Sequence, residues 1–231
     1  MGVKQLGKGV RKIMHPSKLF IRIHRRDNYR HIGRELSYKH FTDRNNKIIY
    51  VCFQGSNGLS DWLHNFLAIP TTMEPYKGCG WRVHKGFARV WRSGNDIVMK
   101  ETITLAKKLS GFAVVFCGYS HGAALAMLAA QDWHYRTGQK CQCVIFGSPR
   151  LAWGDAAQRV LNNAMYLTNW VNRADAVTRL PLKKMGFRHV RVNLVKVSRL
   201  PVLSLFRVSK HHQIYKCPEI YPAKQSLYMA A

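Results

Sequence analysis

The feature that most constrains the fold is a pentapeptide at residues 118–122, Gly-Tyr-Ser-His-Gly, which lies between two segments of opposite character. Residues 112–117 form a continuous apolar run that is typical of a strand buried on both faces. Residues 123–135 are rich in Ala, Leu and Met and predict a helix. A strand that turns directly into a helix leaves no room for side chains two positions before and after the turn residue. The G-x-S-x-G pattern in this context therefore predicts a strained turn that lifts the hydroxyl of Ser120 out of the sheet.

Other segments predict how this turn is embedded. Strands are expected where apolar and β-branched residues run together, and helices where apolar residues recur with helical spacing. The expected strands are 47–54, 143–146, 165–171 and 190–197, and the expected helices are 96–109 and 155–162. This alternation predicts an α/β fold, with a mostly parallel central sheet and helices on both faces.

Composition divides the chain into three parts. Residues 1–46 are dense in Lys, Arg and His and predict a basic, partly irregular N-terminal arm, in which residues 18–24 form either one early strand or a turn of helix. Residues 47–220 form the predicted α/β domain, and residues 221–231 a C-terminal tail.

A serine hydroxyl at such a turn needs an acid and then a histidine later in the chain. The acids that follow Ser120 are Asp132, Asp155, Asp175 and Glu219. Asp132 lies about 18 Å along the predicted helix and is excluded, and Asp155 is explained as a helix N-cap. Asp175 follows the strand at 165–171 and is the best candidate, because catalytic groups gather at the carboxyl ends of parallel strands.

The histidines that could act as the base are His189, His211 and His212. His189 opens a strand pattern and is more simply explained as structural. His211 and His212 share a polar turn, and the residues alone do not distinguish them.

Seven motifs, in order, resemble those of the class 3 (fungal-type) lipase family of α/β-hydrolases. They are residues 53–56 (Phe-Gln-Gly-Ser), 61–66 (Asp-Trp-Leu-His-Asn-Phe), 83–87 (Val-His-Lys-Gly-Phe), 118–125, 146–150 (Phe-Gly-Ser-Pro-Arg), 171–181 and 212–215 (His-Gln-Ile-Tyr). The resemblance implies an α/β-hydrolase fold that hydrolyses carboxylic esters of lipids, triacylglycerol or phospholipid, through an acyl-enzyme.

The resemblance also implies residue roles. Ser120 would be the nucleophile, Asp175 the orienting acid and His212 the general base, since Tyr215 follows His212 as in the family motif. The oxyanion hole would be formed by Ser56 and the backbone N–H of His121. The chain departs from the family pattern at His121, where the family usually has Leu, and at two further positions, Gln54 for Arg and Ala123 for Gly.

A helical stripe of apolar residues follows the predicted oxyanion loop. It consists of Leu59, Trp62, Leu63, Phe66 and Leu67. The family places its lid helix at this point, so the stripe is either a lid that covers the serine or a helix packed permanently on the core.

Charge predicts the kind of partner. The chain has 37 Lys and Arg against 11 Asp and Glu, a formal net charge of +26. Such a surface attracts polyanions, either an anionic membrane or lipid interface or nucleic acid. The sequence shows no RNP, zinc-finger or helix-turn-helix pattern. The alternative to a lipid-ester hydrolase is a non-catalytic basic interaction protein on a hydrolase scaffold.

Cellular location and cofactors are predicted from what the sequence lacks. Residues 1–20 have no apolar core of a signal peptide, and no apolar run reaches the ~18 residues that span a bilayer. Three cysteines lie in apolar strands, as buried reduced thiols do. We therefore expect a cytoplasmic protein that binds membranes peripherally at most. Cys141 and Cys143 do not have zinc-ligand spacing, so no metal and no cofactor is expected.

Overall fold

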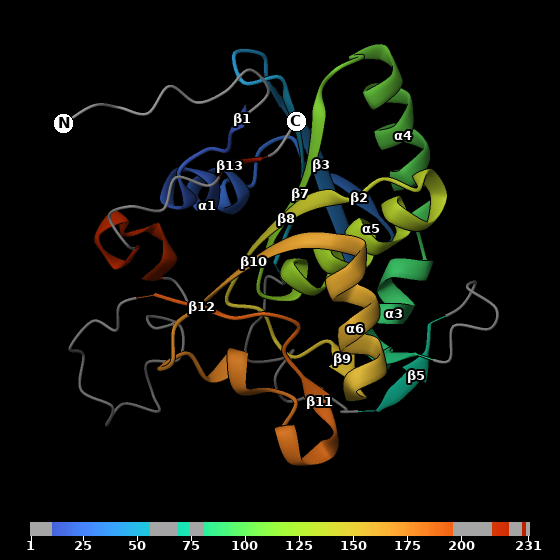
Figure 1. The fold of residues 1–231 in the computed structure, drawn as a ribbon, viewed down its shortest axis with the longest axis vertical. Coiled ribbons are helices and arrows are strands. Elements are labelled where there is room, and N and C mark those ends of the chain that lie inside the picture. Colours follow the sequence, from blue (N-terminus) through green and yellow to red (C-terminus); the bar gives the residue numbers. More distant parts are fainter. Residues whose placement is uncertain (1–10, 56–68, 74–80, 196–213, 222–227, 230–231) are drawn as a thin grey trace.

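The computed structural model describes residues 11–55, 69–73, 81–195, 214–221 and 228–229. Its centre is a seven-stranded sheet (Figure 1). In spatial order the strands are β12 (Asn193–Leu194), β10 (Met165–Val171), β8 (Cys141–Phe146), β7 (Ala113–Tyr119), β4 (Ile48–Phe53), β3 (Leu36–Asp43) and β2 (Arg30–Ile32). Neighbouring strands from β12 to β4 are parallel, and β3 is antiparallel to both β4 and β2. The mostly parallel sheet predicted from the sequence is confirmed.

Helices cover both faces of this sheet, as the sequence predicted (Figure 1). One face carries α3 (Lys85–Arg92), α4 (Asn95–Lys108), α5 (His121–Thr137) and α6 (Gly154–Ala164). The other carries α1 (Pro16–His24) and the 3-10 turns η4 (Ile214–Lys216) and η5 (Pro218–Ile220). Alternate residues of β4 divide between the two cores, Ile49 and Val51 on the first and Ile48 and Tyr50 on the second. This alternation is what a strand buried on both faces requires.

Two smaller sheets and two short turns complete the described structure. The four-stranded antiparallel sheet has the order β11 (Phe187–Arg188), β9 (Ala152–Trp153), β6 (Arg82–His84), β5 (Pro70–Thr72). Strand β1 (Arg11–Lys12) pairs with β13 (Tyr228–Met229). Two 3-10 turns, η1 (Ala176–Arg179) and η2 (Lys183–Met185), connect β10 to β11.

The N-terminal segment differs from the partly irregular arm that its composition predicted. Residues 30–43 form two strands of the main sheet, and α1 buries Leu19, Phe20 and Ile23 against its second face. The basic side chain of Lys39 is accommodated because its ammonium donates to the carbonyl oxygens of Arg25 (2.8 Å) and Asp27 (3.2 Å). The basic residues of this segment therefore belong to ordered helices and strands of the fold.

Element boundaries are otherwise close to those predicted. Strand β10 has the predicted bounds, and α5 begins two residues early, at His121. The strand expected over 190–197 is reduced to β12, because only two of its described residues pair with β10. The helix expected at 155–162 starts at Gly154 with Trp153 as its N-cap, so Asp155 lies in the first turn and is not the cap residue.

The described part of the chain has neither a membrane-spanning helix nor a grouped set of metal ligands. None of its helices has the length and apolar character needed to cross a bilayer. Within the same residues, no three His, Cys, Asp or Glu side chains are grouped so that they could hold a metal ion.

Candidate active site

Ser120 occupies a strained turn between β7 and α5. Its backbone has φ 56° and ψ −124°, a positive φ that L-residues rarely adopt. Its N–H donates to the carbonyl oxygen of Phe146 at 3.0 Å, which holds the turn against β8. The side chain is 3% exposed. The strained turn predicted from the sequence is therefore present, at the N-terminus of a long helix.

The two glycines of the pentapeptide are required by close backbone contacts. A methyl group on Gly118 would lie 2.1 Å from the carbonyl oxygen of Gly122. A methyl group on Gly122 would lie 2.3 Å from the carbonyl oxygen of Phe53, at the end of β4. Both distances are far shorter than van der Waals contact, so only glycine allows the strand, the helix and β4 to meet at Ser120.

The loop after β4 begins beside this turn. A methyl group on Gly55 would lie 3.1 Å from the carbonyl oxygen of Tyr119 and 3.6 Å from the Cβ of Ser120. Ser56, the predicted oxyanion-hole residue, is the next residue and lies outside the described residues. The same holds for the candidate lid residues Leu59, Trp62, Leu63, Phe66 and Leu67, and for His211 and His212.

Asp175 is a buried carboxylate in the loop that follows β10. Its Oδ1 accepts from the N–H of Val177 at 3.0 Å, as the N-cap of η1, and its Oδ2 accepts from the hydroxyl of Tyr215 at 3.1 Å. Asn172 braces the loop, since its carbonyl oxygen accepts from the N–H of Asp175 at 3.0 Å and its Oδ1 from the N–H of Ala174 at 3.1 Å. The carboxylate is thus fixed in position by side-chain and backbone donors.

Tyr215 has a role that the sequence does not predict. It belongs to the motif at residues 212–215, but the motif alone indicates no partner for its hydroxyl. In the structure its fully buried hydroxyl donates to Asp175 and accepts from the N–H of Asn172 at 3.0 Å. It therefore joins η4 to the acid loop.

Tyr119 and Tyr215 connect the acid loop with the serine turn. Burial, and then the negative charge of Asp175, raise the pKa of Tyr119, the residue that precedes Ser120. The same two causes raise the pKa of Tyr215. The rings of Tyr119 and Tyr215 have centroids 6.4 Å apart. The structure therefore brings Ser120 and Asp175, which are far apart in the sequence, to one region at the carboxyl edge of the sheet.

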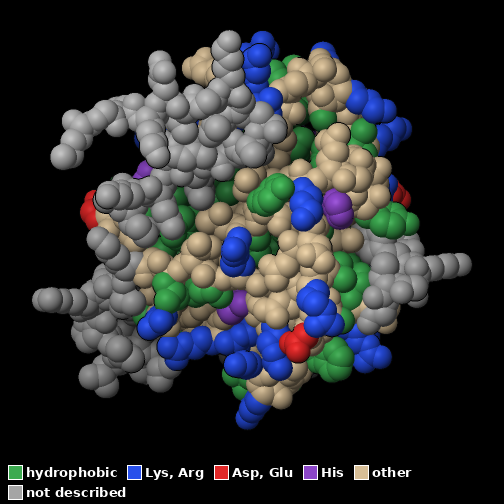
Figure 2. Space-filling model, in the orientation of Figure 1, with side chains coloured by type: hydrophobic (Ala, Val, Ile, Leu, Met, Phe, Trp, Pro, Cys, Tyr) green, Lys and Arg blue, Asp and Glu red, His purple; other side chains and the backbone are tan. Residues whose placement is uncertain are grey.

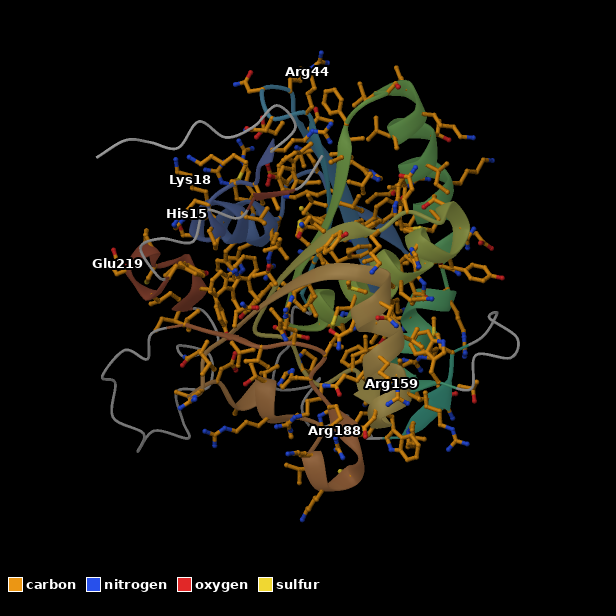
Figure 3. All side chains as sticks on the ribbon, viewed as in Figure 1. His15, Lys18, Arg44, Arg159, Arg188 and Glu219 are labelled. Atoms are coloured by element: carbon orange, nitrogen blue, oxygen red, sulfur yellow. The ribbon has the colours of Figure 1, made fainter. Side chains whose placement is uncertain are left out.

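The other acidic candidates have different surroundings. Asp132 accepts from Arg136 Nε at 2.6 Å within α5. The side chain of Asp155 is 72% exposed and lies 3.9 Å from Arg188. Glu219 is exposed on η5, at the outer edge of the molecule (Figure 3). Asp175 therefore stays the predicted acid.

The histidine candidate that the structure describes is held by the acid loop. His189 Nε2 donates to the carbonyl oxygen of Thr178 at 2.7 Å. Burial lowers the pKa of His189 to about 4, although the hydrogen bond to Thr178 raises it. This structural contact is consistent with the expectation that His189 supports the fold.

His121 is buried at the start of α5, beside the candidate nucleophile. Its ring centroid lies 5.5 Å from that of Phe87, which in turn lies 4.8 Å from that of His84. Burial, and then the positive charge of His84, lower the pKa of His121 to about 4. The imidazole is therefore neutral at pH 7, and the departure from the family's Leu introduces a titratable group into an aromatic environment.

This burial predicts acid-sensitive stability. The pKa of a histidine is about 6.5 in the unfolded chain, so between pH 6.5 and 4 the unfolded state binds a proton that folded His121 refuses. The free energy of unfolding should fall as pH decreases through this window, by roughly 2 kcal/mol at pH 5 from His121 alone. His121→Leu should remove this part of the slope, as measured by urea unfolding at pH 7 and pH 5. The same change at exposed His31 should leave the slope unaltered, and an equal slope in wild type and His121→Leu would contradict the interpretation.

Comparison with known proteins identifies similar chains. The model of the family Lipase (class 3) matches residues 50–185. A lipase from Rhizomucor miehei is 28% identical over 147 residues, which cover 62% of this chain and 40% of that protein. Secreted mono- and diacylglycerol lipase A from Penicillium cyclopium is 29% identical over 154 residues, 64% of this chain and 48% of that protein. The chain spans about half the length of the curated relatives it matches.

Solved structures agree with the fold. One of them, a triacylglycerol lipase whose catalytic centre is described as a serine protease triad, is 26% identical with a TM-score of 0.62. The match covers 67% of this chain and 59% of that chain. The α/β-hydrolase fold that the motifs implied is therefore confirmed.

The expected location is wrong. Relatives from Penicillium cyclopium and, at 31% identity over 149 residues, Fusarium solani are named as secreted lipases. This finding contradicts a cytoplasmic protein. The expectation came from a missing signal-peptide pattern in residues 1–20, and a pattern in so short a segment is weak evidence about location.

Proposed function

Because the chain belongs to the class 3 lipase family, we propose that it is a serine hydrolase that cleaves carboxylic esters of lipids. The observation that carries the proposal is the pairing of a strained serine turn with a buried, hydrogen-bonded carboxylate. Ser120 has φ 56°, and Asp175 is fully buried yet accepts hydrogen bonds on both carboxylate oxygens. Strain and a buried charge are both costly, and they are typical of active sites.

In the proposed reaction, Ser120 Oγ attacks the ester carbonyl carbon while His212 accepts the hydroxyl proton. The backbone N–H of His121 and Ser56 stabilise the oxyanion of the tetrahedral intermediate. The intermediate expels the alcohol, which takes the proton from His212, and an acyl-enzyme remains. Water, deprotonated by His212, then attacks the acyl carbon, and the bond from that carbon to Ser120 Oγ breaks while His212 returns the proton to Oγ. This step releases the fatty acid and regenerates free Ser120. Asp175 orients His212 and stabilises its protonated form.

The contact of Tyr215 with Asp175 supports the choice of His212. The hydroxyl of Tyr215 lies 3.1 Å from Asp175 Oδ2. His212 precedes Tyr215 by three residues, and three residues of extended chain reach about 11 Å at most. This short connection supports the proposal that His212 is the residue that pairs with the acid. His211 is one residue farther away, and it lacks the family's spacing to the tyrosine.

The substrate class follows from the family and the net charge. Triacylglycerols and phospholipids both present the ester that the proposed site attacks. We propose that the protein meets them at an anionic membrane or lipid surface, which its net charge of +26 would attract. The stripe from Leu59 to Leu67 would act as a lid that turns its apolar face onto the lipid.

A second candidate is a basic interaction protein that retains a hydrolase scaffold and binds membranes or nucleic acid without catalysis. The net charge favours it, but binding alone does not explain why Asp175 is buried with hydrogen bonds to both oxygens. Nucleic acid remains the rival polyanion, without a recognised binding motif to support it.

A substrate panel tests the proposal. Purified protein is assayed with a p-nitrophenyl ester, a triacylglycerol and a phosphatidylcholine, each below and above its solubility limit. We expect hydrolysis of all three ester classes or of one lipid class, with a rise in rate once a lipid interface forms. Failure to cleave any ester, by protein that binds anionic vesicles or DNA, would favour the non-catalytic candidate. A smooth saturation curve through the solubility limit would contradict the lid.

A further inference from the structure

The segment that follows Asp175 carries an unusual density of positive charge. Between residues 173 and 191 there are six Lys and Arg, and the single acidic residue is the buried Asp175. The basic residues are Arg173, Arg179, Lys183, Lys184, Arg188 and Arg191. Figure 2 shows lysine and arginine side chains along the lower edge of the molecule, where Figure 1 places β11 and Figure 3 labels Arg188.

Two large apolar side chains project from the same segment. Leu182 is 41% exposed and Met185 45% exposed, on either side of the exposed lysines of η2. Exposing such apolar side chains to water is unfavourable, and burying them against an apolar layer would lower the free energy. Together with Lys183 and Lys184 they form a tip in which two cationic side chains lie between two apolar ones, which we call the η2 tip (residues 182–185).

The arginines around this tip are fixed in place without being neutralised. Arg150 Nη1 donates to the carbonyl oxygen of Pro181 at 2.7 Å, and Arg188 Nη1 to that of Lys183 at 3.0 Å. A carbonyl oxygen orients a guanidinium but leaves its charge intact. Among the described residues, the ion pair that these arginines make is the 3.9 Å contact of Arg188 with the exposed carboxylate of Asp155.

Crowding of like charge is visible in Arg150. Burial, and then the positive charges of Arg179 and Arg188, lower its pKa. Three guanidinium groups with mutual repulsion and one weak acidic partner are better satisfied by an external anion. An anion bound at this segment would therefore reduce the repulsion among the guanidinium groups.

We propose that the η2 tip, with Arg150, Arg179 and Arg188 around it, docks the protein onto an anionic lipid surface. Leu182 and Met185 enter the boundary between headgroups and acyl chains, and the basic side chains contact the phosphate groups. The exposed apolar pair favours this partner over nucleic acid, whose backbone offers no apolar layer. The proposal rests on the proposed function, because it assigns the surface through which the enzyme meets its substrate.

The place of the tip in the fold gives docking a catalytic consequence. Arg150 follows β8, Asp175 follows β10, and Ser120 follows β7. These three strands are parallel neighbours, so their carboxyl ends lie along one edge of the sheet. Docking through the η2 tip therefore turns the edge that carries Ser120 and Asp175 toward the lipid.

Vesicle binding tests the proposal without catalysis. The full chain is mixed with vesicles of ether-linked phosphatidylglycerol and phosphatidylcholine, which an esterase cannot cleave, and sedimented at low and high salt. Lys183→Glu/Lys184→Glu should bind at least about 30-fold more weakly, because each basic residue near such a surface contributes about fivefold. Leu182→Ser/Met185→Ser should bind about tenfold more weakly, with a loss that persists at high salt.

Matched controls are available on α4, which lies at the opposite end of the molecule from β11 (Figure 1). Lys107→Glu/Lys108→Glu makes the same charge change at an exposed lysine pair, and Ile97→Ser removes an apolar side chain that is 42% exposed. Both should bind vesicles within twofold of wild type.

Three outcomes would overturn the docking surface. They are equal losses in the α4 and η2 variants, no loss in the η2 variants, and tighter binding of a short DNA duplex than of vesicles through Lys183 and Lys184. Turnover of a soluble p-nitrophenyl ester distinguishes this proposal from the proposed function. It should be unchanged in the η2 variants if both hold, whereas its absence from wild type would refute the esterase and leave vesicle binding to decide the docking surface.

Discussion

Ser120→Ala should lower turnover of a soluble p-nitrophenyl ester by about 10⁴-fold or more, because the change removes the atom that becomes acylated. The variant should remain folded, since the Ser120 side chain makes no described hydrogen bond that stabilises the turn. The backbone N–H that holds the turn on Phe146 is kept. Initial rates and a thermal unfolding curve, measured on the same preparation, check both parts.

Ser110→Ala is the matched control. Ser110 is exposed just after α4, so the Ser110→Ala variant should hydrolyse the ester within twofold of the wild-type rate. Activity near the wild-type level in folded Ser120→Ala would mean that the hydrolysis uses another nucleophile, and the proposed mechanism would be wrong.

Asp175→Asn should lower turnover by about 10³–10⁴-fold. It should also lower the free energy of unfolding by about 1–3 kcal/mol, because the amide nitrogen that replaces Oδ2 cannot accept from the buried hydroxyl of Tyr215. Asparagine has the same shape, so its oxygen still caps η1 through the N–H of Val177. It carries no charge, however, and therefore neither stabilises a protonated His212 nor selects the tautomer that leaves the other ring nitrogen able to accept a proton. The measurement is kcat for the soluble ester, with circular dichroism to establish the fold.

Asp155→Asn is the control for a lost carboxylate. The Asp155 side chain is 72% exposed and its contact with Arg188 is 3.9 Å long, so its removal should leave turnover within twofold. Equal losses in the two variants would show that general charge balance, and not the buried position of Asp175, supports activity.

Local steric rules explain why the serine turn could be predicted. A buried strand, two glycines and an Ala-rich helix leave one way for residues 118–122 to fold, and the contacts of Gly118 and Gly122 at 2.1 and 2.3 Å are the physical form of that rule. Strand β10 could be predicted for the same reason, since its pattern lies within one short segment.

Features that depend on distant partners could not be predicted. The hydrogen bond from Tyr215 to Asp175 joins residues 40 positions apart, and nothing within either segment indicates it. The apolar residues of α1, Leu19, Phe20 and Ile23, lie in a basic segment whose pattern leaves strand and helix open, and the packing against the sheet decides for a helix. The density of basic residues in 1–46 favoured an irregular arm, although a short amphipathic helix such as α1 needs few apolar residues to pack.

The central claim, that Ser120 is the nucleophile activated by His212, is tested most directly by a fluorophosphonate, which reacts only with activated serines. Intact-mass spectrometry and peptide mapping should find a single adduct on the peptide that contains Ser120. The adduct should be absent from Ser120→Ala, and it should form at least about 10³-fold more slowly in folded His212→Ala. An adduct on another residue, or labelling of His212→Ala at the wild-type rate, would contradict the account.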